Sequence, residues 1–244
     1  MSQAGSTPDG APRSGGGRLR PLDSFDGTLS SRVYASLREA IVSLSFAPGE
    51  ALRKRDICAA LGVSRSPVSE AVARLDAEGL VRVVPQAGTY VARFSMREIR
   101  EGAFLREALE AAAVEYLAPR LADHQQQELH RNLRVQEALV GDGDYTGFYR
   151  LDDEMHRLLM EFTGFPRLHR IARSAWAQVD RARQLVLPHP GRVEATLNEH
   201  RRILEALEAR DGEAARLAMR LHLRQLLTHI APLEAARPEL FEPS

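Results

Sequence analysis

The sequence predicts a mainly α-helical protein with two folded parts: an N-terminal winged helix-turn-helix, made of three helices and a β-hairpin wing, and an all-α antiparallel helical bundle. Three observations predict this architecture. Two short helical patterns are separated by a tight glycine–serine turn, a β-rich hairpin pattern follows them, and only helical periodicity is found after residue 95. We therefore expect a winged domain over residues 28–95 and a helical domain over residues 96–236.

Ahead of these domains, residues 1–27 are rich in glycine, serine and proline and contain almost no apolar residues. Such a stretch cannot bury enough apolar surface to offset the entropy that is lost when a chain becomes ordered. We expect it to be a disordered tail.

The turn of the helix-turn-helix is expected in the stretch LGVSRSPVSEAVARL, residues 61–75. Gly62 can take the left-handed conformation that ends a helix, and Ser64 or Ser66 can cap the next one. Pro67 then lies in the first turn, where its missing N–H costs nothing. The second helix presents one apolar stripe at positions i, i+3, i+4 and i+7, formed by Val68, Ala71, Val72 and Leu75.

Two helices are expected before this turn and a hairpin after it. Helical spacing of apolar residues begins at residue 29, and a short helix is expected over residues 54–61. Residues 80–92 contain two β-rich runs joined through residues 85–88, a pattern that predicts an antiparallel hairpin. This hairpin would be the wing.

The second half is expected to contain six or so helices. Ser95 with Glu98, and Asp123 with Gln126, have the form of a capping box, which marks the start of a helix. The first two expected helices run from residue 95 to about 121 and from residue 123 onward. The next two run from about 144 to 163 and from 166 to about 187. The last two form a pair that is joined at residues 211–212 and ends at residues 231–232.

Composition excludes several classes of protein. No apolar run approaches the roughly 18 residues that cross a bilayer, and the N-terminus lacks the basic-then-apolar order of a signal peptide. Cys58 is the only cysteine, which excludes an intrachain disulfide and fits a reducing compartment. Lys54 is the only lysine, a bias typical of GC-rich bacterial genomes. We therefore expect a cytoplasmic bacterial protein without membrane contact, associated with the nucleoid when it binds DNA.

A DNA-reading surface is indicated at the start of the second helix, whose N-terminal residues lie nearest to the bases in this motif. The polar residues there, which lie off the apolar stripe, are Ser64, Arg65, Ser66 and Ser69. Arginine can bond two acceptors of one guanine, and hydroxyls suit phosphates or base edges. Arg53 and Arg55 open the preceding helix, and Gly88 at the wing tip permits close approach to DNA. The alternative interpretation is a solvated charged face beside an ordinary helix cap.

Residues 48–91 resemble the winged-helix domain of the GntR family of bacterial transcription regulators. The matching elements are PGE, a basic–acidic pair before an apolar position, LGVSRSPV, EA, RL, EGL, and a wing glycine followed three residues later by valine. One position departs from the pattern. Many members have arginine where this chain has Ser69, so one contact with DNA is expected to differ.

The resemblance implies a role for each matching residue. It implies that Arg55 and Arg65 read bases and that Ser64 and Ser66 hold phosphates. It also implies that Gly88 enters the minor groove. A mildly basic balance over residues 28–95, with nine basic against six acidic residues, is consistent with this interpretation.

One aspartate and three histidines of the second half form a candidate metal site. Asp152 precedes His156 by four residues, so the two side chains share one face of a helix. His200 and His222 lie eleven residues before and after Asp211, so they should meet at one level of the final helix pair. This donor set suits zinc first, with nickel, cobalt or manganese as alternatives. The competing interpretation is a helical core with buried, hydrogen-bonded histidines.

From about residue 96 to 230 the chain resembles the FCD ligand-binding domain of the FadR subgroup within the GntR family. The match consists of an aspartate four residues before a histidine, EHRRILEAL at residues 199–207, and HL at residues 222–223. The resemblance implies that the four side chains named above hold a metal ion. It also implies that a small carboxylate effector completes the coordination.

Two further residues bear on this site. Arg106, in LREALE, matches an arginine that often faces the effector pocket of such domains, and an ordinary surface pair with Glu110 is its alternative. Asp153 could compete with Asp152 as a ligand, but only Asp152 has the four-residue spacing of the family.

These features predict a homodimeric, metabolite-responsive transcription regulator, with repression as the expected mode. The winged domain would bind half of a palindromic double-stranded operator, and the helical domain would bind the metal and the carboxylate. Two alternatives stay open: the same regulator with a metal-free pocket that holds an organic ligand directly, and a metal-dependent hydrolase fused to a DNA-binding domain. The histidines lack a general base of the H-E-x-x-H kind, so we do not expect an enzyme.

Overall fold

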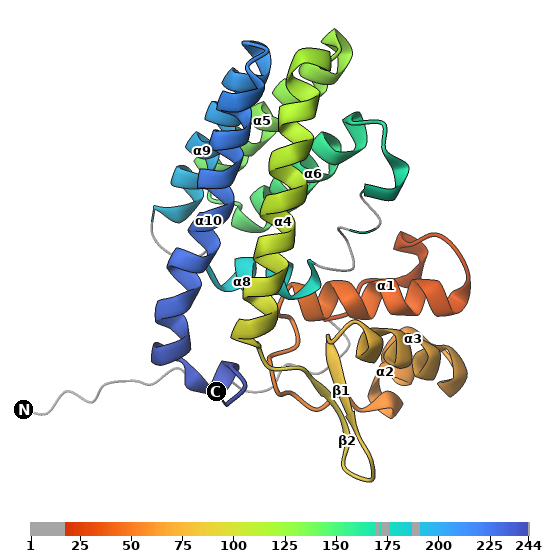
Figure 1. The fold of residues 1–244 in the computed structure, drawn as a ribbon. Coiled ribbons are helices and arrows are strands. Elements are labelled where there is room, and N and C mark those ends of the chain that lie inside the picture. Colours follow the sequence, from red (N-terminus) through yellow and green to blue (C-terminus); the bar gives the residue numbers. More distant parts are fainter. Residues whose placement is uncertain (1–17, 169–170, 172–175, 187–190, 244) are drawn as a thin grey trace, which may run out of the picture.

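The computed structural model describes residues 18–168, 171, 176–186 and 191–243. It consists of a winged helix-turn-helix followed by a helical domain, as Figure 1 shows. The predicted fold class is therefore confirmed. Within the described residues no helix is both long and apolar enough to cross a membrane.

Three helices and a hairpin build the winged domain, namely α1 (Leu29–Val42), α2 (Lys54–Leu61), α3 (Arg65–Ala77), β1 (Val81–Val84) and β2 (Gly88–Val91). Helix α2 ends at Gly62, whose φ of 66° lies in the left-handed region. Ser64 is the N-cap residue of α3, although its side chain makes no capping hydrogen bond, and Ser66 lies inside the first turn. The tight turn between the two helices is thus formed as the sequence predicts.

The core of the winged domain lies between α1 and α3. The apolar stripe of α3 is buried, with relative exposures of 0–1% for Val68, Ala71, Val72 and Leu75. It packs in one cluster with Val33, Leu37 and Ile41 of α1. Because this face is fully covered, only the polar face of α3 is left for solvent or a partner.

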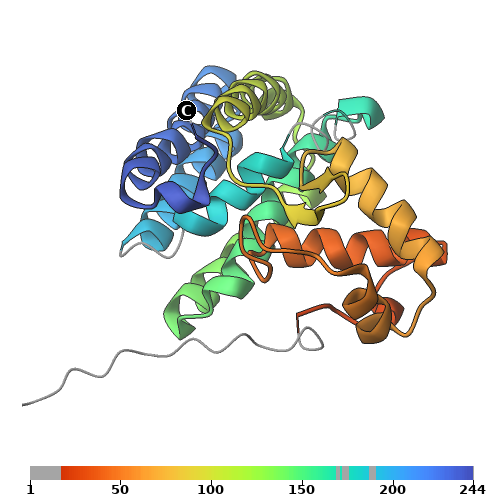
Figure 2. The ribbon, with the colours of Figure 1, turned by 90° about the horizontal axis from the view of Figure 1, so that it is seen from below.

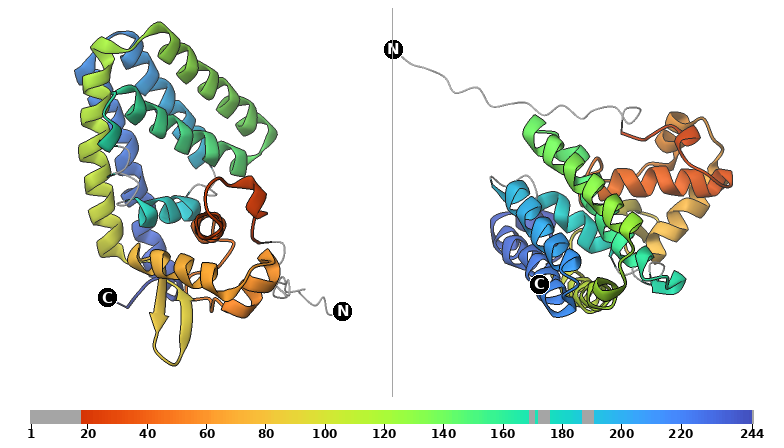
Figure 3. Two further views of the ribbon diagram at one scale, coloured as in Figure 1. Left: turned by 90° about the vertical axis from the view of Figure 1, so that its right-hand side faces the viewer. Right: turned by 90° about the horizontal axis from the view of Figure 1, so that it is seen from above.

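The wing is an antiparallel hairpin in which Val81 lies opposite Val91 and Val84 lies opposite Gly88. It projects from the lower end of the molecule in Figures 1 and 3. Gly88 has a φ of 130°, a conformation that side chains strongly disfavour. The backbone conformation therefore favours glycine at the point where β2 begins.

Residues 18–27, which were expected to belong to a disordered tail over residues 1–27, are ordered in the structure. Residues 1–17 lie outside the described residues, but residues 18–27 have defined contacts with the winged domain. Leu19 is buried in its core, and Arg18 forms an ion pair with Glu50 at 2.7 Å. Ser36 Oγ donates a hydrogen bond to the carbonyl of Arg20 at 2.8 Å. The composition of the segment did not predict this order, because the contacts of only two residues, Leu19 and Arg18, hold it against the domain.

Six helices of the second half carry the candidate site or its surroundings: α4 (Met96–Leu117), α5 (Asp123–Asp142), α6 (Tyr145–Phe162), α8 (Ala177–Val186), α9 (Arg192–Glu208) and α10 (Gly212–Ala236). Helices α4 and α10 are long and lie side by side (Figures 1 and 2). Their inner faces, with those of α5, α6 and α9, enclose a core of buried apolar side chains. The charged candidate site is set into this apolar surrounding.

Three helix boundaries differ from expectation. The N-cap of α5 is Ala122, whose N–H donates to Gln125 Oε1 at 3.0 Å, so Asp123 is the first helical residue rather than the cap. The helix dipole favours an acidic residue in the first turn, so an aspartate at the first helical position is easily taken for an N-cap in the sequence. The helix expected over 166–187 is interrupted at Trp176, which is not helical; residues 169–170, 172–175 and 187 of that interval lie outside the described residues.

Helix α10 continues through Pro232 to Ala236, although Ala231–Pro232 was expected to close it. Proline removes one backbone hydrogen bond, but here the turn that contains Pro232 is exposed, so water can serve the free carbonyl. The helix is extended because Leu233 packs against a cluster that includes Phe94 and Phe241. Packing therefore outweighs the local cost of the proline.

Helix α8 joins the two domains. Ala177, at its start, packs in the core of the winged domain, whereas Val179, Ala182 and Val186 pack with α10. Gln178 Nε2 donates to the carbonyl of Gly79 at 2.7 Å, which ties α8 to the end of α3. Figure 3 shows α8 between the two parts.

Candidate metal centre and DNA-binding surface

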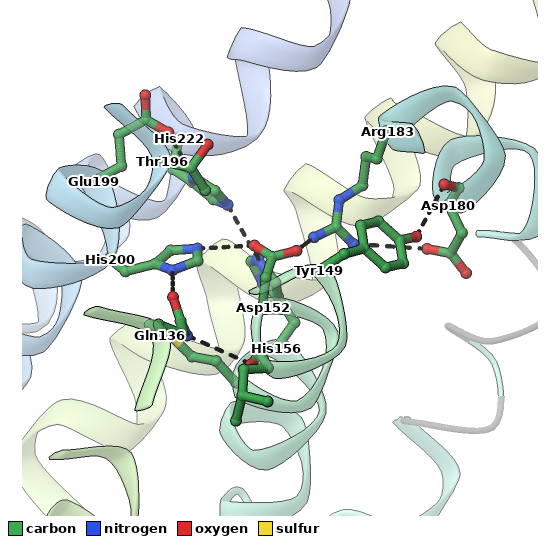
Figure 4. Close-up of polar contacts among 12 residues, drawn as sticks. Gln136, Tyr149, Asp152, His156, Asp180, Arg183, Thr196, Glu199, His200 and His222 are labelled. Atoms are coloured by element: carbon green, nitrogen blue, oxygen red, sulfur yellow. Dashed lines mark hydrogen bonds and ion pairs between the residues drawn. The ribbon is translucent and has the colours of Figure 1, made fainter. Parts of the chain in front are cut away.

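Four side chains from three helices meet inside the helical domain. Asp152 and His156 extend from α6, His200 from α9 and His222 from α10, and all four are buried. One donor atom from each lies within 4.8 Å of the others. Figure 4 shows these side chains turned toward a common centre. The fold thus brings together the four residues that the sequence pattern selected.

The centre is defined by Nε2 of the three histidines and by the carboxylate of Asp152. His200 Nε2 lies 3.0 Å from Asp152 Oδ1, and His156 Nε2 lies 3.7 Å from the same oxygen. His222 Nε2 lies 3.1 Å from His156 Nε2. Asp153 is exposed, so the aspartate with the four-residue spacing is the one that belongs to the centre.

Each histidine is held through its other ring nitrogen. The pairs are His156 Nδ1 with Glu110 Oε2 at 2.5 Å, His200 Nδ1 with Gln136 Oε1 at 2.7 Å, and His222 Nδ1 with Glu199 Oε2 at 2.7 Å. Ionised carboxylates and amide oxygens only accept, so Nδ1 carries the proton and the Nε2 lone pair faces the centre. This is how proteins orient histidines that ligate a metal.

Polar atoms at this centre lack hydrogen-bond partners. Both oxygens of Asp152 and Nε2 of His200 are buried without one among the described residues, although Asp152 forms an ion pair with Arg183. Each such atom costs on the order of 1–3 kcal/mol. Lone pairs also face each other across the contact between His156 and His222. One carboxylate and three imidazoles form a donor set that zinc and its neighbours accept, so the residues fit a divalent transition metal.

Burial sets the charge state of the site. It lowers the pKa of His200 and of His222 well below the usual histidine value, which keeps the rings in the neutral form that binds metals. Burial alone would raise the pKa of Glu110, but Arg106 and His156 outweigh it and hold that pKa at about 2. Arg192 and His222 act in the same way on Glu199, whose pKa is also about 2.

Three arginines surround the centre, each paired with one carboxylate. Arg106 Nε lies 2.5 Å from Glu110 Oε1, and the guanidinium of Arg192 makes two contacts of 2.7 Å with Glu199. Arg183 of α8 contacts the carboxylate of Asp152 (Figure 4). Burial, together with the nearby Arg106, lowers the pKa of Arg183 to about 10.

A cavity of about 30 Å³ lies beside the centre. Its polar lining consists of Arg106, Asp152, Arg183, Arg192, Thr196 and His222, and its apolar lining of Val186, Leu223 and Leu226. The pairing of Arg106 with Glu110 has the i,i+4 geometry considered above, but it is not a surface pair, because the exposures are 4% and 1%. Arg106 thus faces the cavity and is held there by Glu110.

The residues expected to face DNA lie at α2, α3 and the wing, on the surface of the winged domain. Arg53 is the N-cap residue of α2, and the other expected residues are Arg55, Ser64, Arg65, Ser66, Ser69 and Gly88. All seven are exposed. Helices α2 and α3 and the wing, which carry these residues, lie at the end of the molecule away from the helical domain (Figure 1).

Local contacts differ among these residues. Arg65 makes no hydrogen bond or ion pair with any described residue, so its guanidinium is available to a partner. Ser66 Oγ donates to Glu70 Oε1 at 3.4 Å. Lys54 Nζ donates to Ser69 Oγ at 3.4 Å, so a cation from α2 lies beside the position where the resemblance led us to expect arginine.

Comparison with known proteins matches both parts of the chain. Residues 29–91 match the gntR family of bacterial regulatory proteins, and residues 101–225 match the FCD domain. The chain belongs to the GntR family of FCD-containing transcription regulators. It is therefore a bacterial DNA-binding regulator of transcription.

Relatives of this GntR regulator cover most of its length. It is 32% identical over 213 residues to the HTH-type transcriptional repressor RspR of Escherichia coli K12, across 87% of this chain and 93% of that protein. It is 36% identical over 209 residues to an uncharacterized HTH-type transcriptional regulator of Streptomyces ambofaciens, across 86% and 88%.

Two solved structures are similar in fold to this GntR regulator. A putative GntR transcriptional regulator from Rhodococcus sp. RHA1 has a TM-score of 0.72 and 27% identity, and the match covers 83% of this chain and 97% of that one. E. coli McbR/YncC has a TM-score of 0.75 at 21% identity, over 85% and 99% of the chains, which supports the fold alone.

Sequence reasoning missed five polar residues that complete the centre of this GntR regulator: Glu110, Gln136, Arg183, Arg192 and Glu199. Three of them, Glu110, Arg192 and Glu199, had a local signal. Glu110 follows Arg106 by four residues, and Glu199 follows Arg192 by seven, both helical spacings of opposite charge. Gln136 and Arg183 lie on helices without another residue of the site, so only the packing of α5 and α8 against α6 reveals them.

Proposed function

We propose that this GntR regulator is a homodimeric repressor whose helical domain binds a divalent transition metal and a small carboxylate, and whose winged domain binds a palindromic operator in the bacterial cytoplasm. One observation carries the proposal. Three buried histidines have their Nδ1 atoms engaged by fixed acceptors, and their Nε2 atoms converge with Asp152 on one point. A packed hydrogen-bonded core would not leave the Asp152 oxygens and His200 Nε2 without hydrogen-bond partners.

In this proposal Asp152, His156, His200 and His222 hold the metal, with zinc as the first candidate and nickel or manganese as alternatives. The bound metal would act as a Lewis acid that accepts an oxygen of the effector carboxylate. Arg106 lines the adjoining cavity and supplies a second positive charge for the effector. Glu110 keeps that guanidinium in place.

The operator side of the proposal rests on the exposed residues of α2, α3 and the wing. Arg55 and Arg65 would read base edges, and Ser64 and Ser66 would contact phosphates. Gly88 would let the wing approach the minor groove. Arg53 and Ser69 lie within the same surface and would add backbone contacts.

A second copy of the chain is proposed to cover the outer face of α4 and α10. On that face Phe104 is 74% exposed, and Leu217 and Leu221 are each 54% exposed. Glu107, three residues from Phe104, bridges the two helices by ion pairs with Arg220 and Arg224 at 2.9 and 2.8 Å. A two-fold dimer would bury these apolar residues and match a palindromic operator.

Helix α8 offers a route from effector to operator. Arg183 contacts the metal centre, and five residues earlier on the same helix Gln178 bonds Gly79 at the end of α3. Arg181 Nη2 donates to the carbonyl of Ala92, after the wing, at 2.7 Å. An effector that binds one position of α8 better than another would shift the arrangement of the winged domain.

The contact between Arg183 and Asp152 favours one second candidate, a metal-free pocket. There the arginine would neutralise Asp152 permanently, and Arg106 and Arg192 would hold the organic ligand directly. The hydrolase alternative is less favoured by the site, because Glu110 and Glu199 both accept hydrogen bonds from a histidine and an arginine. Neither carboxylate is free to serve as a general base.

The test uses full-length protein purified without a histidine tag. We expect about one metal ion per chain by elemental analysis, and a clear loss of metal in His200→Ala. Arg201→Ala, at the half-exposed residue that follows, is the matched control. Operator duplexes selected from a random pool are then titrated by fluorescence anisotropy at fixed salt, with and without acetate. Absence of metal, with no stabilisation on adding Zn²⁺, Ni²⁺ or Mn²⁺, would favour the metal-free pocket.

A further inference from the structure

The linker between the two domains consists of residues 92–95. It runs from the end of β2 at Val91 to the start of α4 at Met96. Phe94, in the middle of the linker, is fully buried although it lies outside any helix or regular strand. The contacts that hold the linker therefore contribute to the orientation of the winged domain relative to the helical domain.

A segment near the end of the chain, residues 238–242, pairs with this linker through the backbone and is termed the strap. The N–H of Phe94 donates to the carbonyl of Leu240 at 2.9 Å, and the N–H of Glu242 donates to the carbonyl of Phe94 at 2.8 Å. The two bonds form a parallel β-bridge between Phe94 and Phe241. Figure 1 shows the strap beside the connection from β2 to α4. Both backbone groups of the buried Phe94 are thus satisfied by the strap.

Side chains hold the linker from the strap and from α8. The side chain of Phe241 is 3% exposed, and its ring centroid lies 5.6 Å from that of Phe94, a separation typical of an aromatic pair. From α8, the guanidinium of Arg181 lies 4.6 Å from the centroid of the Phe94 ring and donates to the carbonyl of Ala92 at 2.7 Å. Phe241 is therefore the side chain through which the strap is anchored.

The strap follows the helix that carries His222. Leu226 and Ile230 come four and eight residues after His222 on α10, so the three side chains share one face of that helix. The leucine and the isoleucine are buried in one cluster with Phe94 and Phe241. Because such an interior is close-packed, a displacement of α10 would be transmitted to the strap and the linker.

We propose that the strap fixes the orientation of the winged domain, and that its release from the linker frees this domain to move against the helical domain. With the strap bound, the two winged domains of a dimer are preorganised for the two half-sites of an operator. With the strap released, binding to both half-sites must also order the winged domains, so the affinity for the full operator falls. Binding of one winged domain to one half-site does not change. The inference needs no metal, and its consequence for the operator rests on the proposed dimer.

The first experiment measures release of the strap by limited proteolysis of the full chain. Trypsin cleaves after arginine, and Arg93 is an exposed residue of the linker, next to the bridge at Phe94. We expect Phe241→Ala to speed cleavage at Arg93 by at least about fivefold, because cleavage follows the population of the open form. Phe241→Leu keeps most of the apolar contact and should keep most of the protection. Phe165→Ala, at a phenylalanine that is 50% exposed, is the matched control, and mass spectrometry identifies the fragments.

The second experiment compares binding to the full operator and to a duplex with one half-site, by anisotropy at fixed salt. We expect Phe241→Ala to weaken binding to the full operator by about tenfold, since the second contact gains less from the first, and to leave half-site binding unchanged. Glu242→Pro removes the N–H that donates to Phe94 but keeps the buried ring. It should act in the same direction, and thermal melts verify that each variant is folded.

Three outcomes would overturn the inference. Unchanged cleavage at Arg93 in both Phe241→Ala and Glu242→Pro would show that the strap does not hold the linker. Faster cleavage with an unchanged affinity for the full operator would remove the strap from operator recognition. Equal losses on the two duplexes would assign Phe241 to the stability of the winged domain rather than to its orientation. A wild-type protein that binds both duplexes equally would instead contradict the proposed dimer, and the cleavage rates then decide whether the strap holds the linker.

Discussion

Arg183 contacts the carboxylate of Asp152 across the buried centre of the helical domain. The same carboxylate lies 3.0 Å from His200 Nε2, so the arginine and the three imidazoles approach it together. In metal-free protein the guanidinium supplies the positive charge that a metal ion would supply. Arg183 and the metal would therefore compete for Asp152, and a mutation of Arg183 should change the affinity of the site for the metal.

Arg183→Gln is expected to raise the affinity for zinc by about three- to tenfold, because the competing cation is gone. The same change should lower the melting temperature of the metal-free protein, since a buried carboxylate is left without its partner. Zinc affinity is measured by competition with a chromophoric chelator, and melting by circular dichroism with and without zinc. A lower zinc affinity in the variant would mean that Arg183 positions Asp152 rather than competes for it.

Gln136→Leu is expected to weaken zinc binding by about 10- to 100-fold, the usual effect of removing a partner that orients a ligating histidine. Gln136 Oε1 accepts a hydrogen bond from His200 Nδ1, and Gln136 Nε2 donates to Asn132 Oδ1 at 2.6 Å, so the amide orientation is fixed. Leucine keeps most of the volume but accepts nothing. Gln127→Leu, on the exposed face of the same helix, should leave zinc affinity unchanged.

The four candidate metal ligands could be predicted from the sequence, whereas the residues that surround them could not. Asp152 with His156 is a local spacing on one helix, and His200 with His222 follows from equal distances to one turn. Arg183 and Gln136 belong to helices whose rotation and packing no local pattern specifies. The same holds in the winged domain, where α3 and its polar edge were predicted, but the contact of Lys54 with Ser69 depends on how α2 crosses α3.

Arg65→Ala is expected to reduce affinity for the selected operator by about 1–3 kcal/mol and to leave non-specific binding nearly unchanged. Arg65 is exposed at the start of α3 and has no partner among the described residues, so the change costs little stability. Anisotropy titrations with operator and scrambled duplexes at one salt concentration separate the two effects. Arg100→Ala, an exposed arginine of α4, is the control. An equal loss on both duplexes would assign Arg65 to phosphate contact.

Asp180 should make stability depend on pH. Burial, with Asp153 as a like-charged neighbour, raises the pKa of Asp180 to about 7 in the folded protein. The unfolded chain ionises this group at lower pH, so folding stability falls as pH rises through the window from about 4 to 7 and is constant above it. The slope is at most about 1.4 kcal/mol per pH unit. Urea unfolding across this window should show a steeper fall for wild type than for Asp180→Asn.

The control for Asp180 is Asp142→Asn, an exposed residue at the end of α5, which should retain the wild-type slope. Asp180→Asn should also be more stable than wild type above pH 7, where the buried charge is present in wild type alone. Equal slopes in all three proteins would mean that Arg38 and Arg183 keep Asp180 ionised throughout.

Leu221→Glu is expected to convert the proposed dimer into a monomer without unfolding the chain. Leu221 is 54% exposed in the single chain, so a glutamate there is tolerated in the monomer. In a two-fold interface it would place a charge from each copy against apolar surface, which typically costs several kcal/mol. Light scattering coupled to size exclusion gives the mass, and circular dichroism verifies the fold. Val135→Glu, at an exposed apolar residue of α5, should leave the mass unchanged. A wild-type monomer, or a dimer that survives Leu221→Glu, would remove α4 and α10 from the interface.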